Sequence, residues 1–425
     1  MESKQEDQKL PQQAVAEIQR ALARIARIRN LQPVPNADRL LTGSAFGWEY
    51  VIVDNQISEG ELGVFFEPDS KMPTGVSWLS EKLQGSVIKT VKLRGSVSQG
   101  LFVECKEFDE PLYSQLFSST KEGDDVTSLL GITKRPDELP DLDDSGYAKY
   151  CYNVYNPPPK TDEPRVQNVG RLLKEKLHGL PFRATLKIDG TSVTYGLSQN
   201  KPHDLVISSR NLLVSDPDSV YAQVAQKHKI HQKLLRMNKL EESTDATTKE
   251  QQQHQQQPDT YPRYVIQGEI YGPSIHKNLL NVKQFCFAAF SVWDSIQSQY
   301  LQVDKQDKLL TEQDIPQAPV ATYIDDIDNN EKPLIGDAFD ANNMTTKQLL
   351  HYARGNYPGT QNAREGFVLR SCVGVPRARI SFKVINNEYL LKKDARQATD
   401  KPRNDKNKKQ KEQSSPTQKH EIIES

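Results

Sequence analysis

The chain has 425 residues, of which 36% are hydrophobic and 26% are charged, and its formal net charge is −1. This length predicts two or three domains, and the balanced charge excludes a protein that binds nucleic acid through an overall basic surface. No run approaches the roughly 18 apolar residues of a membrane span, so we expect no membrane association. Four widely spaced cysteines favour reduced thiols in an intracellular protein, either cytoplasmic or nuclear.

The first third of the chain predicts a small β-structure between two polar segments. Residues 1–14 are polar and are expected to form a disordered tail. Short strands separated by turn residues then follow one another closely up to residue 135, which suggests a small β-barrel of the OB type. Residues 136–160 are rich in proline and acidic residues and predict a linker. Three basic residues of the barrel alternate with apolar ones, and we favour RNA contact for them: Lys89, Lys92 and Arg94.

From residue 161 onward the sequence predicts a mixture of strands and helices. Residues 166–179 have apolar positions on one face and end in glycine, as a helix does. A Gln-rich insertion at 243–259 predicts a solvated loop, and 396–425 predict a basic disordered tail. Apolar or alternating runs predict strands within 183–197, 203–211, 263–272, 283–294, 364–371 and 378–391.

Lys187 lies in the apolar, β-branched run ATLKIDGTSVTYG. In a strand, Lys187 and Asp189 point to the same face, and Gly190 lets the backbone turn or a ligand approach closely. A lysine amine can attack phosphorus when it is unprotonated, a state that a neighbouring cation and a poorly solvated pocket favour. Taken alone, however, this short pattern fits an exposed strand lysine better than a nucleophile.

Further charged residues occupy apolar strands, where an isolated charge is costly. Glu269 ends one such strand, Glu365 begins another, and Lys383 lies inside a third. These positions are explained if the side chains converge on a shared phosphate and metal, because carboxylates suit Mg²⁺ and lysines suit phosphates. Arg210, which follows a further strand, would add a fork-shaped phosphate donor. The eight histidines show no metal-ligand spacing and are expected to be ordinary surface or core residues.

In chain order the sequence carries KIDG, SRN, GEIYG, FAAFSVWD, EGFVLR and SFKVINNEYLLK. This series resembles the covalent nucleotidyltransferase superfamily of ATP-dependent ligases and mRNA capping enzymes, and KTDEPRVQN is typical of its RNA ligases. The N-terminal part resembles the OB-type module of the Deinococcus-type RNA ligases. The resemblance implies an α+β fold, with an N-terminal OB-like β-barrel at 15–135. A nucleotidyltransferase (ATP-grasp-like ligase) domain of antiparallel sheets flanked by helices would occupy 161–395.

The resemblance also implies an ATP-dependent RNA ligase that uses Mg²⁺ or Mn²⁺. Lys187 would attack the α-phosphate of ATP and form a lysyl-AMP, while Asp189 and Gly190 would shape the loop that presents it. Glu269 would bind the ribose or orient the metal, and Glu365 would hold the metal.

The resemblance assigns the remaining site residues to phosphate and base. Lys383 would contact the α-phosphate, and Arg210 would bind the phosphates or the 5′-phosphate end of RNA. One of Phe287 or Phe290 would stack on adenine, and the sequence does not choose between them.

One departure concerns the last motif, where many relatives carry two lysines separated by one residue. Here the second position is Ile385. A single lysine, Lys383, would then suffice, with Lys392 or Lys393 as possible helpers.

The expected partner is RNA, or a nicked duplex with an RNA 3′-OH strand, and the enzyme is expected to act as a monomer. It would join 3′-OH and 5′-phosphate ends. Three alternatives stay open: a DNA ligase, a GTP-using capping enzyme, and a non-catalytic RNA-binding protein that has kept the fold. The capping alternative is disfavoured because the OB-like module precedes the catalytic domain. The non-catalytic alternative is disfavoured because all four buried charged residues are present.

Overall fold

The structure of the chain is a computed structural model. It describes residues 21–53, 57–134, 158, 163–175, 182–210, 212–240, 262–321, 345–372 and 380–399. The expected N-terminal tail, the Gln-rich insertion and nearly all of the expected linker lie outside the described residues. The expected C-terminal tail at 396–425 begins too early, because residues 396–399 belong to a helix, and its remainder lies outside the described residues. Within the described part, no helix is long and apolar enough to cross a membrane.

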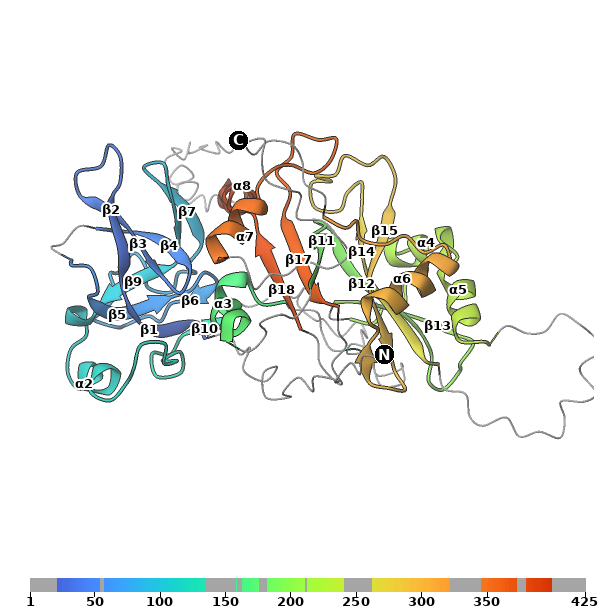
Figure 1. Cartoon of the computed structure of the whole chain (residues 1–425), viewed down its shortest axis with the longest axis horizontal. Coiled ribbons are helices and arrows are strands. Elements are labelled where there is room, and N and C mark those ends of the chain that lie inside the picture. Colours follow the sequence, from blue (N-terminus) through green and yellow to red (C-terminus); the bar gives the residue numbers. More distant parts are fainter. Residues whose placement is uncertain are drawn as a thin grey trace, which may run out of the picture.

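The N-terminal strands form several small antiparallel sheets at one end of the molecule (Figure 1). One sheet has the order β1 (Ala23–Arg27), β5 (Leu62–Phe66), β9 (Leu101–Glu104), and a second has the order β2 (Arg29–Pro33), β3 (Leu40–Ala45), β4 (Trp48–Val53). The hairpin β7 (Thr90–Leu93)–β8 (Ser96–Gln99) and the pair β6 (Ser70–Lys71)–β10 (Thr133–Lys134) complete the set, with the short helices η1 (Cys105–Glu107) and α2 (Leu112–Phe117).

The strand-rich character expected for this module is confirmed, but the expected barrel is not closed. Among the described residues, hydrogen bonds join the strands into separate sheets instead of one continuous ring. The break lies at Ile28, a fully buried residue between β1 and β2, where the chain leaves one sheet and enters the next. Side chains, including Trp48 and Tyr50, fill the space between the sheets.

The C-terminal part contains two antiparallel sheets flanked by helices, as expected. The smaller sheet has the order β11 (Phe182–Leu186), β17 (Gly366–Ser371), β18 (Ser381–Ile385). The larger sheet has the order β13 (Leu205–Ser209), β12 (Thr191–Leu197), β14 (Tyr264–Tyr271), β15 (Cys286–Asp294), β16 (Gln299–Tyr300). The helices are α3 (Val166–Glu175), α4 (Val220–Lys227), α5 (Ile230–Met237), α6 (Val303–Glu312), α7 (Thr346–Tyr352) and α8 (Asn387–Thr399).

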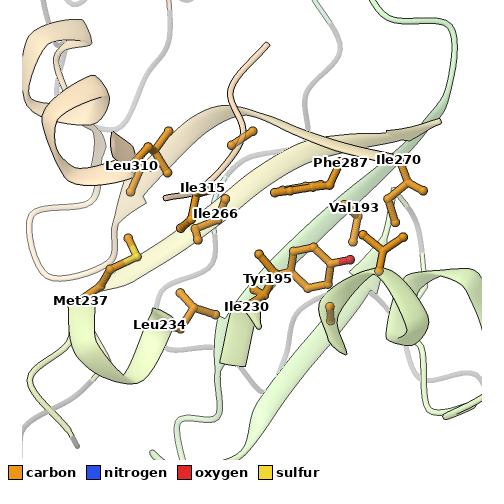
Figure 2. Packing of buried hydrophobic residues seen from close by; sticks show 14 of the residues in the cluster. Val193, Tyr195, Ile230, Leu234, Met237, Ile266, Ile270, Phe287, Leu310 and Ile315 are labelled. Atoms are coloured by element: carbon orange, nitrogen blue, oxygen red, sulfur yellow. The ribbon is translucent and has the colours of Figure 1, made fainter. Parts of the chain in front are cut away.

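The largest core lies on one face of the five-stranded sheet and is covered by α4, α5 and α6 (Figure 2). Tyr195 and Phe287 pack edge to face there, with ring centroids 5.5 Å apart. Ile230 and Leu234 of α5 are fully buried against them. Burial of side chains of this size contributes about 1.5–3 kcal/mol each, so this core holds the larger sheet in place beside the site.

The expected strand at 378–391 is only half correct. The strand ends at Ile385, and residues from Asn387 onward form α8. Asn386 is fully buried, and its side-chain oxygen accepts a hydrogen bond from the backbone N–H of Glu388 at 3.0 Å. A side-chain oxygen that accepts from the first turn is a helix-start signal, and this local signal overrides the apolar run that suggested a continuing strand.

The two parts of the molecule are joined by a buried carboxylate. Glu67, fully buried at the end of β5, accepts hydrogen bonds from Arg24 at 2.6 Å and from the side-chain amide of Asn168 in α3 at 2.6 and 2.7 Å. A second contact brings Arg165 to 3.7 Å from Asp69. Helix α3 therefore connects the N-terminal sheets to the smaller C-terminal sheet, against which it also packs (Figure 1).

Candidate active site

The predicted site residues meet where the two C-terminal sheets join. Strand β11 ends at Leu186 in the smaller sheet and β12 begins at Thr191 in the larger one, so residues 187–190 pass from one sheet to the other. A cavity of about 330 Å³ opens beside this connection. Eight of the nine predicted site residues line it: Lys187, Asp189, Gly190, Arg210, Glu269, Phe290, Glu365 and Lys383.

Lys187 is paired with Glu365, the residue that directly precedes the neighbouring strand β17. Its Nζ lies 3.0 Å from Glu365 Oε2, and the two side chains are 25% and 12% exposed. Burial alone lowers the pKa of Lys187, but the carboxylates of Glu365 and Glu269 outweigh burial and raise it above the ordinary value of 10.5. The amine is therefore held in its protonated form while both carboxylates are charged.

Glu269 faces the same space from the larger sheet. Ser192 lies opposite it on β12 and donates its hydroxyl to Glu269 Oε2 at 3.2 Å. Burial raises the pKa of Glu269 to about 7, although the nearby Lys187 acts in the opposite direction. A carboxyl group with such a pKa is poorly compensated by its protein neighbours, and a cation in the cavity would supply the missing charge.

Asp189 is held by two residues that sequence reasoning missed. Its Oδ1 is 2.9 Å from His276 Nδ1 and accepts a hydrogen bond from the Tyr389 hydroxyl at 2.9 Å. Burial by itself raises the pKa of Asp189, but these contacts lower it below its ordinary value, and Asp189 in turn raises the pKa of His276. No local pattern identifies either partner, because His276 lies in a loop and Tyr389 in α8.

Gly190 allows the loop to approach the neighbouring strand closely. A Cβ at this position would lie 2.3 Å from the backbone oxygen of Ile270 and 2.8 Å from Cγ of Glu269. No real side chain tolerates such contacts with backbone, so glycine is required for the observed spacing between the loop and β14.

Lys383 reaches the cavity from β18, where it pairs with Val368 of β17. Its backbone N–H donates to the carbonyl of Pro164 at 2.8 Å, so the segment that leads into α3 forms one wall of the site. Arg210 lines the cavity directly after β13. Of the possible helpers, Lys393 lines the cavity and donates to the Tyr389 hydroxyl at 3.2 Å.

The structure separates the two candidate phenylalanines. Phe290 lines the cavity, whereas Phe287 is 1% exposed and belongs to the core beneath the larger sheet. The structure therefore removes Phe287 from the candidate base-binding residues and leaves Phe290. Both faces of β15 are apolar, so the sequence pattern alone could not say which face meets the cavity.

Glu163 and Arg370 also line the cavity and were missed from the sequence. The guanidinium of Arg370 lies 4.9 Å from the ring centroid of Phe290, donates to the Thr185 hydroxyl at 2.8 Å and lies 3.4 Å from Glu163 Oε1. Arg370 thereby supports the ring of Phe290 from one side. Its signal in the sequence was only a charged residue in the strand EGFVLRS.

The described residues contain no group of three or more His, Cys, Asp or Glu side chains arranged to hold a metal. Glu365 and Glu269 supply two carboxylates at one cavity. This donor set fits Mg²⁺ or Mn²⁺, because such ions commonly bind one or two carboxylates and take their other ligands from substrate phosphates and water.

Comparisons with known proteins agree with this architecture. A family model described as an OB-fold domain matches residues 22–105, and one described as RNA ligase matches residues 174–385. No curated protein sequence matches the chain.

Among solved structures, the chain is similar to the RNA ligase of Naegleria gruberi. Its structure with pyrophosphate is 26% identical, with a TM-score of 0.64, and the match covers 89% of this chain and 100% of that one. A mutant of that protein with ATP and Mn matches with 26% identity and a TM-score of 0.64 over 88% and 99% of the two chains. Another mutant with AMP and Mn has a TM-score of 0.63, with the same identity and coverage.

Proposed function

We propose that this chain, which is an ATP-dependent RNA ligase, seals 3′-OH and 5′-phosphate ends through a covalent AMP on Lys187. The observation that carries the proposal is the position of Lys187, whose Nζ lies 3.0 Å from Glu365 in a cavity that also holds Lys383 and Arg210. A partly buried lysine beside other cations and carboxylates fits attack on a nucleoside triphosphate.

The cofactors are ATP and a divalent cation, Mg²⁺ or Mn²⁺. Glu365 and Glu269 would hold the cation. When bound, it cancels the negative charge that raises the pKa of Lys187, so that burial then lowers this pKa and favours the neutral amine. Phe290 would stack on the adenine, with Arg370 behind its ring.

In the first step, the lone pair of Lys187 Nζ attacks the α-phosphorus of ATP. A P–N bond forms, the bond from the α-phosphorus to its bridging oxygen breaks, and pyrophosphate leaves with that electron pair. The nitrogen attacks as the neutral amine and then releases one proton to solvent, which leaves a neutral P–N linkage. Lys383 and Arg210 would stabilise the negative charge that builds up on the phosphate oxygens, which is the main demand of this chemistry.

The next two steps join the RNA ends. A 5′-phosphate oxygen attacks the lysyl-AMP, so that the P–N bond breaks and AMP moves to the RNA end. The 3′-OH then attacks that 5′-phosphate, forming the phosphodiester and releasing AMP. We propose a nicked duplex as the substrate, since the OB-type module beside the site provides a second surface for nucleic acid.

The test is the intact mass of the chain after incubation with ATP and Mg²⁺ or Mn²⁺. We expect an added AMP, absent from Lys187→Ala. A matched control is Lys233→Met, which changes another buried lysine, located on α5 and bonded to the Asp314 carbonyl at 2.6 Å. This variant should keep the adduct. A GMP adduct from GTP would instead indicate capping chemistry, and no adduct from folded protein freed of AMP would indicate a non-catalytic RNA-binding protein.

Four finer assignments belong to the same proposal. We place the chain with the Deinococcus-type RNA ligases, with functional units at 15–135 and 161–395. We also propose that it acts as a monomer, inside the cell. Sealing of nicked duplexes with RNA or DNA at each end of the nick would test the substrate, and light scattering would test the oligomeric state.

A further inference from the structure

Tyr357 lies in the loop between α7 and β17, and its hydroxyl contacts three backbone groups of the active-site segments. The side chain is 1% exposed. The hydroxyl donates to the carbonyl of Lys187 at 2.8 Å, and it accepts from the backbone N–H of Asp189 at 3.0 Å and of Glu365 at 3.2 Å. A hydroxyl has one donor and two acceptor lone pairs, so these contacts use its full capacity.

The hydroxyl of Tyr357 lies where the paired strands β11 and β17 separate. The ladder of β11 and β17 ends at the pair Leu186–Phe367, and one further hydrogen bond joins the Lys187 N–H to the Gly366 carbonyl at 2.9 Å. Beyond this point the two segments separate, because residues 187–190 pass to the larger sheet. Backbone groups buried where two strands separate need other partners, and Tyr357 supplies one to each of the three.

We propose that Tyr357 is a positioning residue that holds residues 187–190, here called the nucleophile loop, against Glu365 just before β17, and this inference rests on the proposed function. The Tyr357 side chain is not among the described residues that line the cavity. It therefore acts through the backbone of Lys187, Asp189 and Glu365. A displacement of about 1 Å in a reacting group can cost 100-fold in rate. Hydrogen bonds that fix the backbone of Lys187 should therefore affect the rate of the chemical step.

A purely structural role for Tyr357 is the competing explanation, because its ring packs with Leu186, Ile385 and Tyr389 in a small core. Tyr357→Phe keeps this ring and removes only the hydroxyl. Tyr195→Phe is the matched control. Tyr195 is also fully buried, and its hydroxyl donates to the backbone carbonyl of Tyr221 at 2.9 Å, outside the nucleophile loop.

The experiment measures single-turnover formation of the AMP adduct by the full chain with saturating ATP and Mg²⁺. Two quantities are read separately: the first-order rate constant and the final fraction of chains that carry AMP. A loss of folded protein lowers the final fraction and leaves the rate constant unchanged, whereas mispositioning lowers the rate constant. The ATP concentration that gives half the maximal rate is measured for each variant as well.

For Tyr357→Phe we expect a rate constant lower by about 10- to 100-fold, with the wild-type final fraction and the wild-type half-saturating ATP concentration. Tyr195→Phe should react at the wild-type rate. An unchanged rate constant in Tyr357→Phe, or an equal loss in both variants, would overturn the proposal. So would a variant without a cooperative melting transition, since the hydroxyl would then serve the fold. Failure of the wild type to form any adduct would instead refute the proposed function.

Discussion

Lys187 Nζ and Glu365 Oε2 lie 3.0 Å apart at the junction of the two sheets. Lys187 follows the last residue of β11, and Glu365 precedes the first residue of β17, so pairing of these two strands brings the residues together. The contact favours the protonated form of the lysine amine, because the carboxylate raises its pKa. Glu365 therefore acts on both the position and the protonation of the proposed nucleophile.

Glu365→Gln removes a charge that raises the pKa of Lys187 while keeping the shape of the side chain. Two effects are expected. The adduct should form about 100- to 1,000-fold more slowly, because a metal ligand is lost. In the metal-free protein, the pKa of Lys187 should also be lower than in the wild type, because burial then lowers it with less opposition. Adduct rates with Mg²⁺, and titration of Lys187 by NMR without metal, would check the two effects separately. Glu312→Gln on α6 is the control, and a wild-type pKa of Lys187 in metal-free Glu365→Gln would contradict the argument.

The two phenylalanines of β15 should give opposite results. Phe290→Ala should raise the half-saturating ATP concentration about 5- to 150-fold, since stacking on a base contributes about 1–3 kcal/mol. Phe287→Ala should lower the free energy of unfolding by about 3–5 kcal/mol and leave ATP binding nearly unchanged in the folded fraction. Isothermal titration with ATP and urea unfolding would separate the two effects. Weaker ATP binding in Phe287→Ala alone would place the base elsewhere.

The His276–Asp189 contact predicts a pH-dependent contribution to stability. Because Asp189 raises the pKa of His276, the contribution is fully present below about pH 6.5 and is lost as pH rises through the folded-state pKa. Wild type should therefore exceed His276→Asn in free energy of unfolding by more at about pH 5.5 than at about pH 8.5. The difference should reach up to about 1 kcal/mol, since His276 is half exposed. Urea unfolding measures it, with His231→Asn as control, and a pH-independent difference would refute the ion pair.

The hydrogen bonds from Asn168 to Glu67 link the two parts of the chain, and we predict that they stabilise this contact. Asn168→Ala should lower the free energy of unfolding by about 1–3 kcal/mol, because it leaves a buried carboxylate with one donor fewer. Asn168→Asp should cost more, since it places a second carboxylate beside Glu67. Denaturant unfolding checks this order, and Asn200→Ala, at an exposed turn, is the control. Equal stability of all three variants would show that the hydrogen bonds to Glu67 contribute nothing.

We predict that the β7–β8 hairpin contacts RNA and takes no part in forming the AMP adduct. Lys92 and Arg94 are exposed there, and α8 packs against β7. The double variant Lys92→Ala/Arg94→Ala should form the AMP adduct normally but bind nicked duplex more weakly. Its salt dependence of binding should fall by about one unit of slope for each lost phosphate contact. Binding measured at several salt concentrations tests this, and an unchanged slope would remove the hairpin from the RNA surface.

The sequence by itself predicted most of the strands and the charged residues that meet at the cavity. Lys187, Glu269, Glu365 and Lys383 stand out because charged residues in apolar strands are costly without a shared ligand, and this argument needs no coordinates. Alternating and apolar runs also indicate the strands, since their period is local to the chain.

Only the tertiary structure decided which residues surround those four. His276, Tyr357 and Tyr389 come from loops and a helix far from Lys187 in sequence, and no local period records contacts between distant segments. The sequence left Phe287 and Phe290 as alternatives because β15 is apolar on both faces, and only packing shows that Phe290 lines the cavity while Phe287 lies in the core.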